Sequence, residues 1–212
     1  MQLLNEKLWF PHPSTATRDG FLAIGGDLST ERLLLAYNSG IFPWFENNQP
    51  ILWWSPNPRM VLFPEKFKVS KSLRKTIRSK KFQITINQNF PAVIKNCASV
   101  PRKGQADTWI TNKMQKAYIQ LHKAGHAMSV EVWENKTLVG GLYGVNLPDK
   151  KVFCGESMFS LVSDASKIAF YYLVQLSIEK GYKFIDCQIY NSHLERLGAE
   201  EIDRNEFLSM LS

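Results

Sequence analysis

The chain has 212 residues, and 44% of them are hydrophobic, so it can form one large domain or two small ones with a packed core and is not a disordered chain. No stretch approaches the roughly 20 apolar residues of a membrane-spanning helix, so we expect no membrane association. The formal net charge is +7, and Cys97, Cys154 and Cys187 lie in no metal-binding pattern, so we expect a cytoplasmic protein without a metal site.

The N-terminal part of the chain is rich in aromatic residues. Glu6 and Lys7 interrupt the first apolar segment and no cleavage site follows it, so a secretory signal is not expected. Residues 31–38 are predicted to form a helix capped by Ser29 or Thr30. Three tryptophans follow within eleven residues, and the prolines among them exclude a regular helix. Each ring has two interpretations, burial in the core or a surface on which a base stacks. They are Trp44, Trp53 and Trp54.

A basic segment follows a short strand predicted at 60–63. Eight of the 26 Lys and Arg residues, and a single acid, lie between residues 65 and 81, while the rest of the chain has equal numbers of both charges. Ser70 is predicted to cap a helix over 71–79, with Leu73 and Ile77 on its apolar face. Four cations share the opposite face, either as a solvated surface or as a binding surface for a polyanion such as nucleic acid. They are Lys71, Arg74, Lys75 and Arg78.

The second half of the chain alternates between strands and helices. We predict a strand at 82–86, a helix at 90–98, a polar loop at 101–107 and a helix at 112–124. Three antiparallel strands between 127 and 159 then precede a helix at 164–180. The order β-β-β-α-β-α-β over 127–202 predicts an α/β (α+β) fold with a mixed sheet, and it resembles the acyltransferase fold of the acetyl-CoA-dependent N-acetyltransferases. The link at 157–164 lacks the glycines of their pyrophosphate loop, so no CoA is expected.

The strand predicted at 182–188 carries the main candidate for chemistry. Side chains alternate along a strand, so Asp186 and Gln188 share one face while Ile185 and Cys187 share the other. A carboxylate beside an amide can bind and deprotonate an amine. The alternative is the hydrated end of a strand. Cys187 is expected to point away from the pair and to serve in packing.

Seven segments together resemble the bacterial leucyl/phenylalanyl-tRNA–protein transferases. The resemblance runs from about residue 21 to 211, and several of the segments are long and rare. They are GIFPWF (40–45), WWSPNPR (53–59), TWIT (108–111), LVGGLYGV (138–145), GESMFS (155–160), ASK (165–167) and IDCQ (185–188).

The resemblance implies transfer of Leu or Phe, and Met less well, from aminoacyl-tRNA to the N-terminal Arg or Lys of a protein. The product is marked for degradation by the N-end rule pathway. The aminoacyl ester is already activated, so no metal or cofactor is expected. The implied organisation is a small N-terminal domain (1–62) and an acetyltransferase-like catalytic domain (63–212) that includes the basic helix at 70–81, in a monomer.

The resemblance also assigns roles to residues. It places the terminal adenosine of the tRNA between Trp44 and Trp109, and Glu156, Asp186 and Gln188 at the reacting ester. Asp186 is the preferred group for the amine proton, although the sequence leaves Gln188 open for that role. The basic helix would hold phosphates of the acceptor stem through Lys71, Arg74, Lys75 and Arg78. The pocket for the amino-acid side chain would be apolar, with Leu142, Met158, Leu173 and Ile185 as candidates.

Two rival functions remain at this stage. An N-acetyltransferase would use acetyl-CoA, which the link without glycines argues against. A non-enzymatic RNA-binding module would use the basic helix but would not need Asp186.

Overall fold

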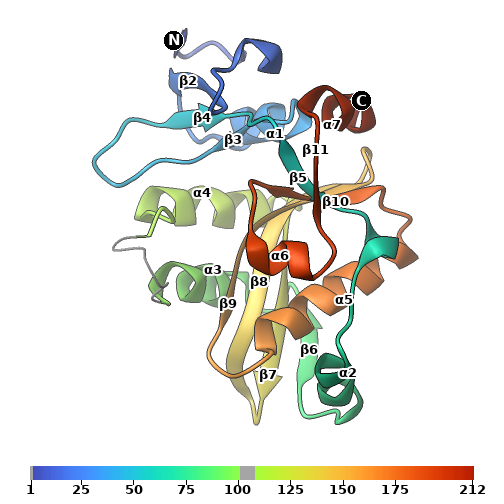
Figure 1. Ribbon diagram of the computed structural model, residues 1–212. Coiled ribbons are helices and arrows are strands. Elements are labelled where there is room, and N and C mark those ends of the chain that lie inside the picture. The colour runs from blue at the N-terminus through green and yellow to red at the C-terminus, as the bar shows by residue number, and fades with distance from the viewer. Residues whose placement is uncertain (1, 101–107) are drawn as a thin grey trace.

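The computed structural model describes residues 2–100 and 108–212, which form two sheets stacked along the long axis of the molecule (Figure 1). The polar loop predicted at 101–107 lies outside these residues. The smaller sheet has the order β1-β2-β4-β3, and helix α1 (Thr30–Asn38) lies beside it. Its strands are β1 (Gln2–Leu4), β2 (Phe21–Gly25), β3 (Phe42–Pro43) and β4 (Leu52–Trp54).

Buried aromatic side chains hold the smaller sheet together. Trp53 is fully buried and its indole N–H donates to the Gly25 carbonyl at 2.9 Å, so this ring belongs to the core. Ser29, rather than Thr30, caps α1 by accepting a hydrogen bond from the Arg32 amide.

The larger sheet has seven strands in the order β11-β5-β10-β9-β8-β7-β6. All neighbours are antiparallel except β9 and β10, which are parallel. The predicted mixed-sheet α/β fold is confirmed. The strands are β5 (Arg59–Leu62), β6 (Gln83–Ile86), β7 (Ala127–Glu134), β8 (Thr137–Leu147), β9 (Val152–Ser160), β10 (Phe184–Gln188) and β11 (Glu200–Ile202).

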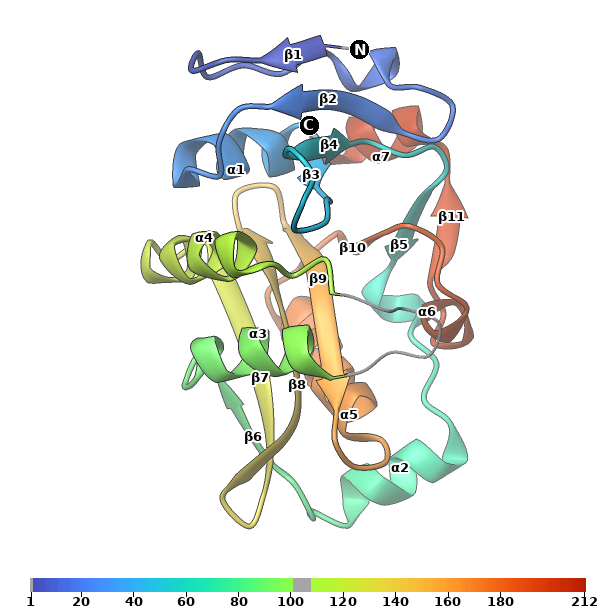
Figure 2. The same ribbon diagram turned by 90° about the vertical axis from the view of Figure 1, so that its left-hand side faces the viewer.

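Helices cover both faces of this sheet (Figure 2). α3 (Phe90–Ser99) and α4 (Asn112–Lys123) pack on one face, and α5 (Ala165–Glu179) packs on the other. Ser70 caps the basic helix α2 (Lys71–Arg78) as predicted, and Leu73 is the residue that α2 buries. The remaining helices are η1 (Pro13–Thr15), η2 (Pro64–Lys66), α6 (Ser192–Arg196) and α7 (Arg204–Leu211).

Glycines allow close packing in the central hairpin of the sheet. A Cβ atom on Gly144 would lie 2.1 Å from the Cys154 carbonyl oxygen, and the register between β8 and β9 shifts at this residue. A Cβ atom on Gly140 would lie 2.5 Å from that of Ala165, so helix α5 begins directly against the strand. These contacts explain why the segment tolerates no side chain at either position.

The division into domains at residue 62 stays a prediction. β5, which that division gives to the small domain, pairs with β10 and β11 in the larger sheet. Among the described residues, no helix is both long enough and apolar enough to cross a membrane.

Candidate active site

A cavity of about 360 Å³ lies where β9 and β10 separate. The two strands pair only from Phe184 opposite Val152 to Asp186 opposite Cys154, so the residues beyond this point are released from the ladder. Side chains from both core clusters line the cavity, which therefore reaches both faces of the sheet at this gap. All four residues predicted for the side-chain pocket lie in its wall, together with Phe153 and Phe170. The four are Leu142, Met158, Leu173 and Ile185.

Glu156 on β9 is the carboxyl group of the cavity wall. Tyr37 donates to its Oε1 at 2.7 Å and Tyr118 donates to its Oε2 at 3.0 Å. Gln188 donates from Nε2 to Oε1 at 2.7 Å. Burial raises the pKa of Glu156 to about 7, although the three hydrogen bonds act in the opposite direction.

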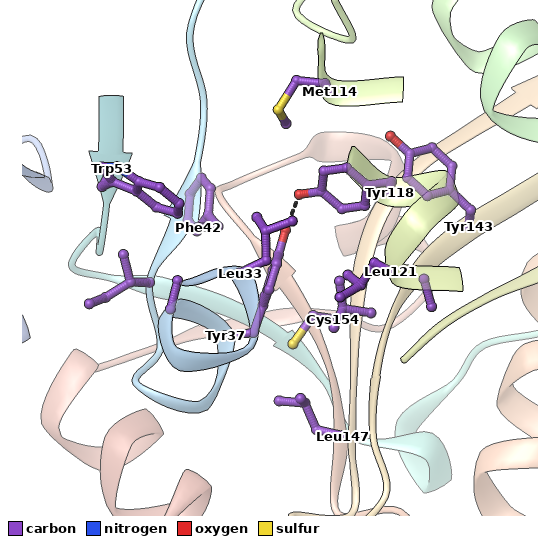
Figure 3. Packing of buried hydrophobic residues seen from close by; sticks show 14 of the residues in the cluster. Leu33, Tyr37, Phe42, Trp53, Met114, Tyr118, Leu121, Tyr143, Leu147 and Cys154 are labelled. Atoms are coloured by element: carbon purple, nitrogen blue, oxygen red, sulfur yellow. Dashed lines mark hydrogen bonds between the residues drawn. The ribbon is translucent and has the colours of Figure 1, made fainter. Parts of the chain in front are cut away.

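The two tyrosines also contact each other through their hydroxyl oxygens (Figure 3). Tyr37, Tyr118 and Glu156 therefore form a closed triangle of three hydrogen bonds. Each phenol carries one proton, so with an ionised Glu156 only two of these three contacts hold a proton at a time, whereas a protonated Glu156 fills the third by donating to one of the phenols. A carboxyl whose pKa lies near 7 exchanges that proton close to neutral pH.

Gln188 reaches Glu156 because the end of β10 is irregular. The pairing with β5 shifts register between Asp186 and Gln188, and Gln188 has a left-handed backbone with φ of 68°. The backbone N–H of Gln188 donates to Oδ1 of Asp186 at 2.9 Å, which fixes this conformation. The cavity wall includes both Cys187 and Gln188.

Asp186 occupies a different environment from the one expected. Its two oxygens accept hydrogen bonds from Nε and Nη2 of Arg59 at 2.9 and 2.7 Å, and both side chains are buried. The guanidinium carbon of Arg59 lies 4.8 Å from the ring centre of Phe42 and 4.6 Å from that of Phe207. Among the described residues that line the cavity, Asp186 is absent. The Asp186 carboxylate therefore faces Arg59 and the backbone of Gln188, whereas Gln188 lines the cavity.

The two tryptophans predicted to hold an adenosine both line the cavity. Trp44 directly follows β3 and is 40% exposed, and Trp109 lies just before α4 and is half-buried. The Trp44 carbonyl accepts a hydrogen bond from the indole of Trp54 at 2.8 Å, which braces the segment that carries Trp44.

The basic helix lies apart from the cavity. Its four predicted phosphate-binding side chains are exposed, on the surface of α2 opposite Leu73. In both ribbon views α2 lies at the end of the molecule remote from the smaller sheet (Figures 1 and 2).

The sequence did not indicate three residues that lie in the cavity wall or contact its Glu156. Tyr37 and Tyr118 fit the apolar stripes of their helices and gave no signal apart from the hydroxyl group. Cys187 was expected to point away and instead lines the cavity, because the gap between β9 and β10 exposes both faces of β10. Burial raises the pKa of its thiol, which makes it a poor nucleophile.

The described parts of the chain contain no group of three or more His, Cys, Asp or Glu side chains that could hold a metal ion. The cavity wall carries the Glu156 carboxyl and the Gln188 carboxamide, and the buried phenols of Tyr37 and Tyr118 hydrogen-bond to that carboxyl. These groups suit proton transfer and hydrogen bonding.

Comparisons with known proteins agree on one family. The family model described as leucyl/phenylalanyl-tRNA protein transferase matches residues 61–212, and the model of its N-terminal domain matches residues 26–57. Relatives named leucyl/phenylalanyl-tRNA–protein transferase in Christiangramia forsetii and Flavobacterium johnsoniae are each 57% identical over 211 residues. The alignments cover 100% of this chain, and 100% and 99% of those proteins. A relative of the same name in Thermodesulfovibrio yellowstonii is 54% identical, with 99% of this chain and 84% of that protein covered.

Solved structures give more distant similarities. The structure of L-PGS from Bacillus licheniformis matches 81% of this chain and 54% of its own chain, with 12% identity and a TM-score of 0.46. A GCN5-related N-acetyltransferase from Kribbella flavida matches 79% of this chain and 59% of its own, with 11% identity and a TM-score of 0.40.

Proposed function

The chain belongs to the leucyl/phenylalanyl-tRNA–protein transferase family, and on that premise we propose how its residues perform the reaction. The chain is an aminoacyltransferase that moves Leu or Phe from aminoacyl-tRNA to the N-terminal residue of a protein. One observation supports the assignment of the site above all: Glu156 and Gln188 share one cavity with Trp44, Trp109 and an apolar wall.

The reaction exchanges an ester for an amide. The acceptor α-amine attacks the carbonyl carbon of the aminoacyl ester, the amide bond forms, and the bond to the ribose oxygen breaks. The amine loses a proton and the departing ribose oxygen gains one. The ester is already activated, so the proposed reaction needs no metal or cofactor.

Glu156 is the proposed group for this proton. An α-amine has a reference pKa of roughly 7.7–8.0, so it is mostly protonated at neutral pH and cannot attack. A carboxyl with a pKa of about 7 is matched to such an amine much better than an ordinary glutamate. The hydroxyls of Tyr37 and Tyr118 hold the carboxyl in place and complete a path along which its proton can shift.

Gln188 and Asp186 take supporting roles in this proposal. The Gln188 carboxamide donates to Glu156, which leaves its oxygen to orient the incoming amine. Asp186, already engaged by Arg59, fixes the backbone of Gln188 and is a positioning residue. The proton role first expected of Asp186 therefore passes to Glu156.

The remaining wall of the cavity is proposed to bind the donor. Stacking on an aromatic ring contributes about 1–3 kcal/mol per base, so Trp44 and Trp109 are suited to the terminal adenosine. The apolar side chains of Leu142, Leu173 and Ile185 suit the side chain of Leu or Phe. Met158 adds a flexible thioether that can adapt to both shapes and to Met, a poorer donor.

The acceptor is proposed to begin with Arg or Lys, as the resemblance to the family implies. The product would then be marked for degradation by the N-end rule pathway. Since charged tRNA is a cytoplasmic substrate, we propose that the protein acts in the cytoplasm, as a monomer.

A direct assay tests this function. Incubation of the protein with Phe-tRNA and a peptide that begins with Arg should give Phe-Arg-peptide, detected by mass spectrometry. A matched peptide that begins with Ala is the control for acceptor choice and should remain unmodified. Acetylated peptide formed from acetyl-CoA would identify an N-acetyltransferase instead. Bound tRNA without any peptide product would identify an RNA-binding module, and either result would overturn the proposal.

A further inference from the structure

We infer that Lys167, His193 and Arg196 form a phosphate-binding site for the last nucleotides before the terminal adenosine of the donor tRNA. This site would join the basic helix α2 to the cavity. The inference rests on the proposed function, because that function brings the 3′ end of a tRNA into the cavity.

His193 connects the site to the cavity. It lies in the first turn of α6, is half-buried and lines the cavity wall beside Leu194. The side chain of Asn191 caps this helix by accepting from the His193 amide at 2.9 Å, and so fixes the place from which the imidazole projects. A donor group at this rim can meet the part of the tRNA just outside the cavity.

Lys167 and Arg196 lie close enough to His193 to act on its charge. Burial and then these two cations lower the pKa of His193, so at neutral pH its ring is uncharged and offers one N–H. Lys167 donates to Oδ1 of Asp164 at 2.8 Å, which leaves two of its three N–H donors for a ligand. Arg196 is exposed.

The acids near these cations are few. Asp164 is the partner of Lys167, and Glu195 accepts a hydrogen bond from the Tyr190 hydroxyl at 2.8 Å. Glu201 lies close enough to Tyr190 to raise the pKa of that phenol, after the hydrogen bond from Tyr190 to Glu195 and burial. The side of α6 that carries His193 is therefore left with a surplus of donors that an anion would satisfy.

The start of α5 links this cluster to the basic helix. The hydroxyl of Thr76 on α2 lies 3.4 Å from Oδ2 of Asp164, the residue that also binds Lys167. In both ribbon views α6 lies above the start of α5 and α2 lies below it (Figures 1 and 2). The elements that carry these cations, α2, the first turn of α5 with Lys167 and α6 with Arg196, thus lie in succession, and α6 reaches the cavity through His193.

A single strand of RNA fits this arrangement. It carries one charge per nucleotide, and proteins that guide single strands combine a basic track with aromatic rings on which bases stack. Here the rings, Trp44 and Trp109, lie inside the cavity and the track lies outside it. The phosphates that precede the stacked adenosine would meet Lys167, His193 and Arg196 before the duplex reaches α2.

The experiment compares two donors. Phe-tRNA carries the phosphates, whereas phenylalanyl-adenosine carries only the terminal nucleoside. For Lys167→Gln/Arg196→Gln we expect the KM of Phe-tRNA to rise roughly five- to twentyfold and its salt dependence to weaken by about 0.7 log units per lost contact. The KM of phenylalanyl-adenosine should stay within about twofold, because that donor has no phosphate to lose. His193→Leu should add to the loss with Phe-tRNA.

The matched control is Lys180→Gln/Arg18→Gln, which removes the same charges elsewhere. Lys180 follows the opposite end of α5, about 20 Å from Lys167 along the helix. This control should leave both KM values unchanged. An unchanged KM and salt slope for Phe-tRNA in the Lys167/Arg196 variant would overturn the inference, as would an equal loss with both donors. Failure of the proposed function looks different, because then the wild-type protein forms no peptide product from either donor.

Discussion

At the scale of single residues, the proposed mechanism depends on the protonation of Glu156. The carboxyl lies among two phenols and a carboxamide, which can satisfy it in either protonation state. Burial destabilises the ionised carboxylate of Glu156 by more than its hydrogen bonds stabilise it, so the pKa of Glu156 rises to about 7. Asp186, two residues from Gln188, has its charge matched by Arg59 instead. The two carboxyls thus differ in role because their partners differ.

Glu156→Gln tests this role. The wild-type kcat/KM should rise with pH with a midpoint near 7, the pKa of Glu156, whereas the variant should keep only the rise due to the acceptor amine. Activity near pH 7.5 should fall by roughly 10²–10⁴-fold. The measurement is the pH–rate profile with Phe-tRNA and an Arg-peptide. A variant that keeps the wild-type profile would assign the proton to another group.

The same substitution has a predictable effect on stability. The folded-state pKa of Glu156 lies above its model value of 4.5, so the folded state binds its proton more tightly than the unfolded state does. The wild-type free energy of unfolding should therefore fall, relative to the Gln variant, as the pH rises from about 4.5 to about 7. At 1.36 kcal/mol per pKa unit the loss is at most about 3 kcal/mol. Urea unfolding of both proteins at pH 5 and pH 8 measures it.

At the scale of secondary-structure elements, one face of α2 packs against the body of the protein and the opposite face is charged and exposed. Leu73 is buried and Ile77 is half-buried against the body, whereas the four cations on the opposite face are exposed. Exposed charges of one sign contribute little to folding and much to the attraction of a polyanion. Substitutions on the charged face should therefore separate binding from folding.

Replacing Lys71, Arg74, Lys75 and Arg78 with Gln tests this division. The KM for Phe-tRNA should rise at least tenfold and the slope of log(kcat/KM) against log salt should become less steep by up to about 3.6, since each of the four lost phosphate contacts removes about 0.7–0.9. The melting temperature should change little because Leu73 is kept. The matched control replaces Lys95, Lys116, Lys123 and Lys180, which are also exposed. Equal effects in both variants would mean that only net charge matters.

At the scale of the whole molecule, the site is assembled from distant parts of the chain. Tyr37 comes from α1 beside the smaller sheet, Tyr118 from α4, Glu156 from β9 and Gln188 from β10. The hydroxyl of Tyr37 thus ties the N-terminal part of the chain to the reacting centre. Arg59 makes a second tie, since its guanidinium lies between the rings of Phe42 and Phe207.

Tyr37→Phe measures the effect of the hydrogen bond from Tyr37 to Glu156. The Tyr37 hydrogen bond lowers the pKa of Glu156, so its loss should raise that pKa further above 7. A hydrogen bond to a charged group contributes about 1–1.5 kcal/mol more than one between neutral groups, which corresponds to a shift of about one unit in the midpoint of the pH–rate profile, toward higher pH. Tyr172→Phe is the control, because Tyr172 is exposed on α5 and should leave the midpoint in place. A shift in the opposite direction would contradict the proposed network.

The sequence by itself determined the elements and much of the pocket. Hydrophobic periodicity and capping residues such as Ser70 are local signals, so the helices and the order of strands over 127–202 could be predicted from them. The family resemblance gave the activity, which the comparisons bear out. It also indicated the tryptophans and the four apolar residues that the structure brings into one cavity. Their assigned roles remain predictions.

Only the tertiary structure decided which polar groups are hydrogen-bonded to each other. Strand alternation predicts the direction of a side chain but not its partner, and the partner of Asp186 is Arg59, 127 positions away in the chain. Tyr37 and Tyr118 look like core residues in sequence, and only packing brings their hydroxyls to Glu156. The pKa of that carboxyl depends on burial and on these three-dimensional contacts, which no local pattern of residues encodes.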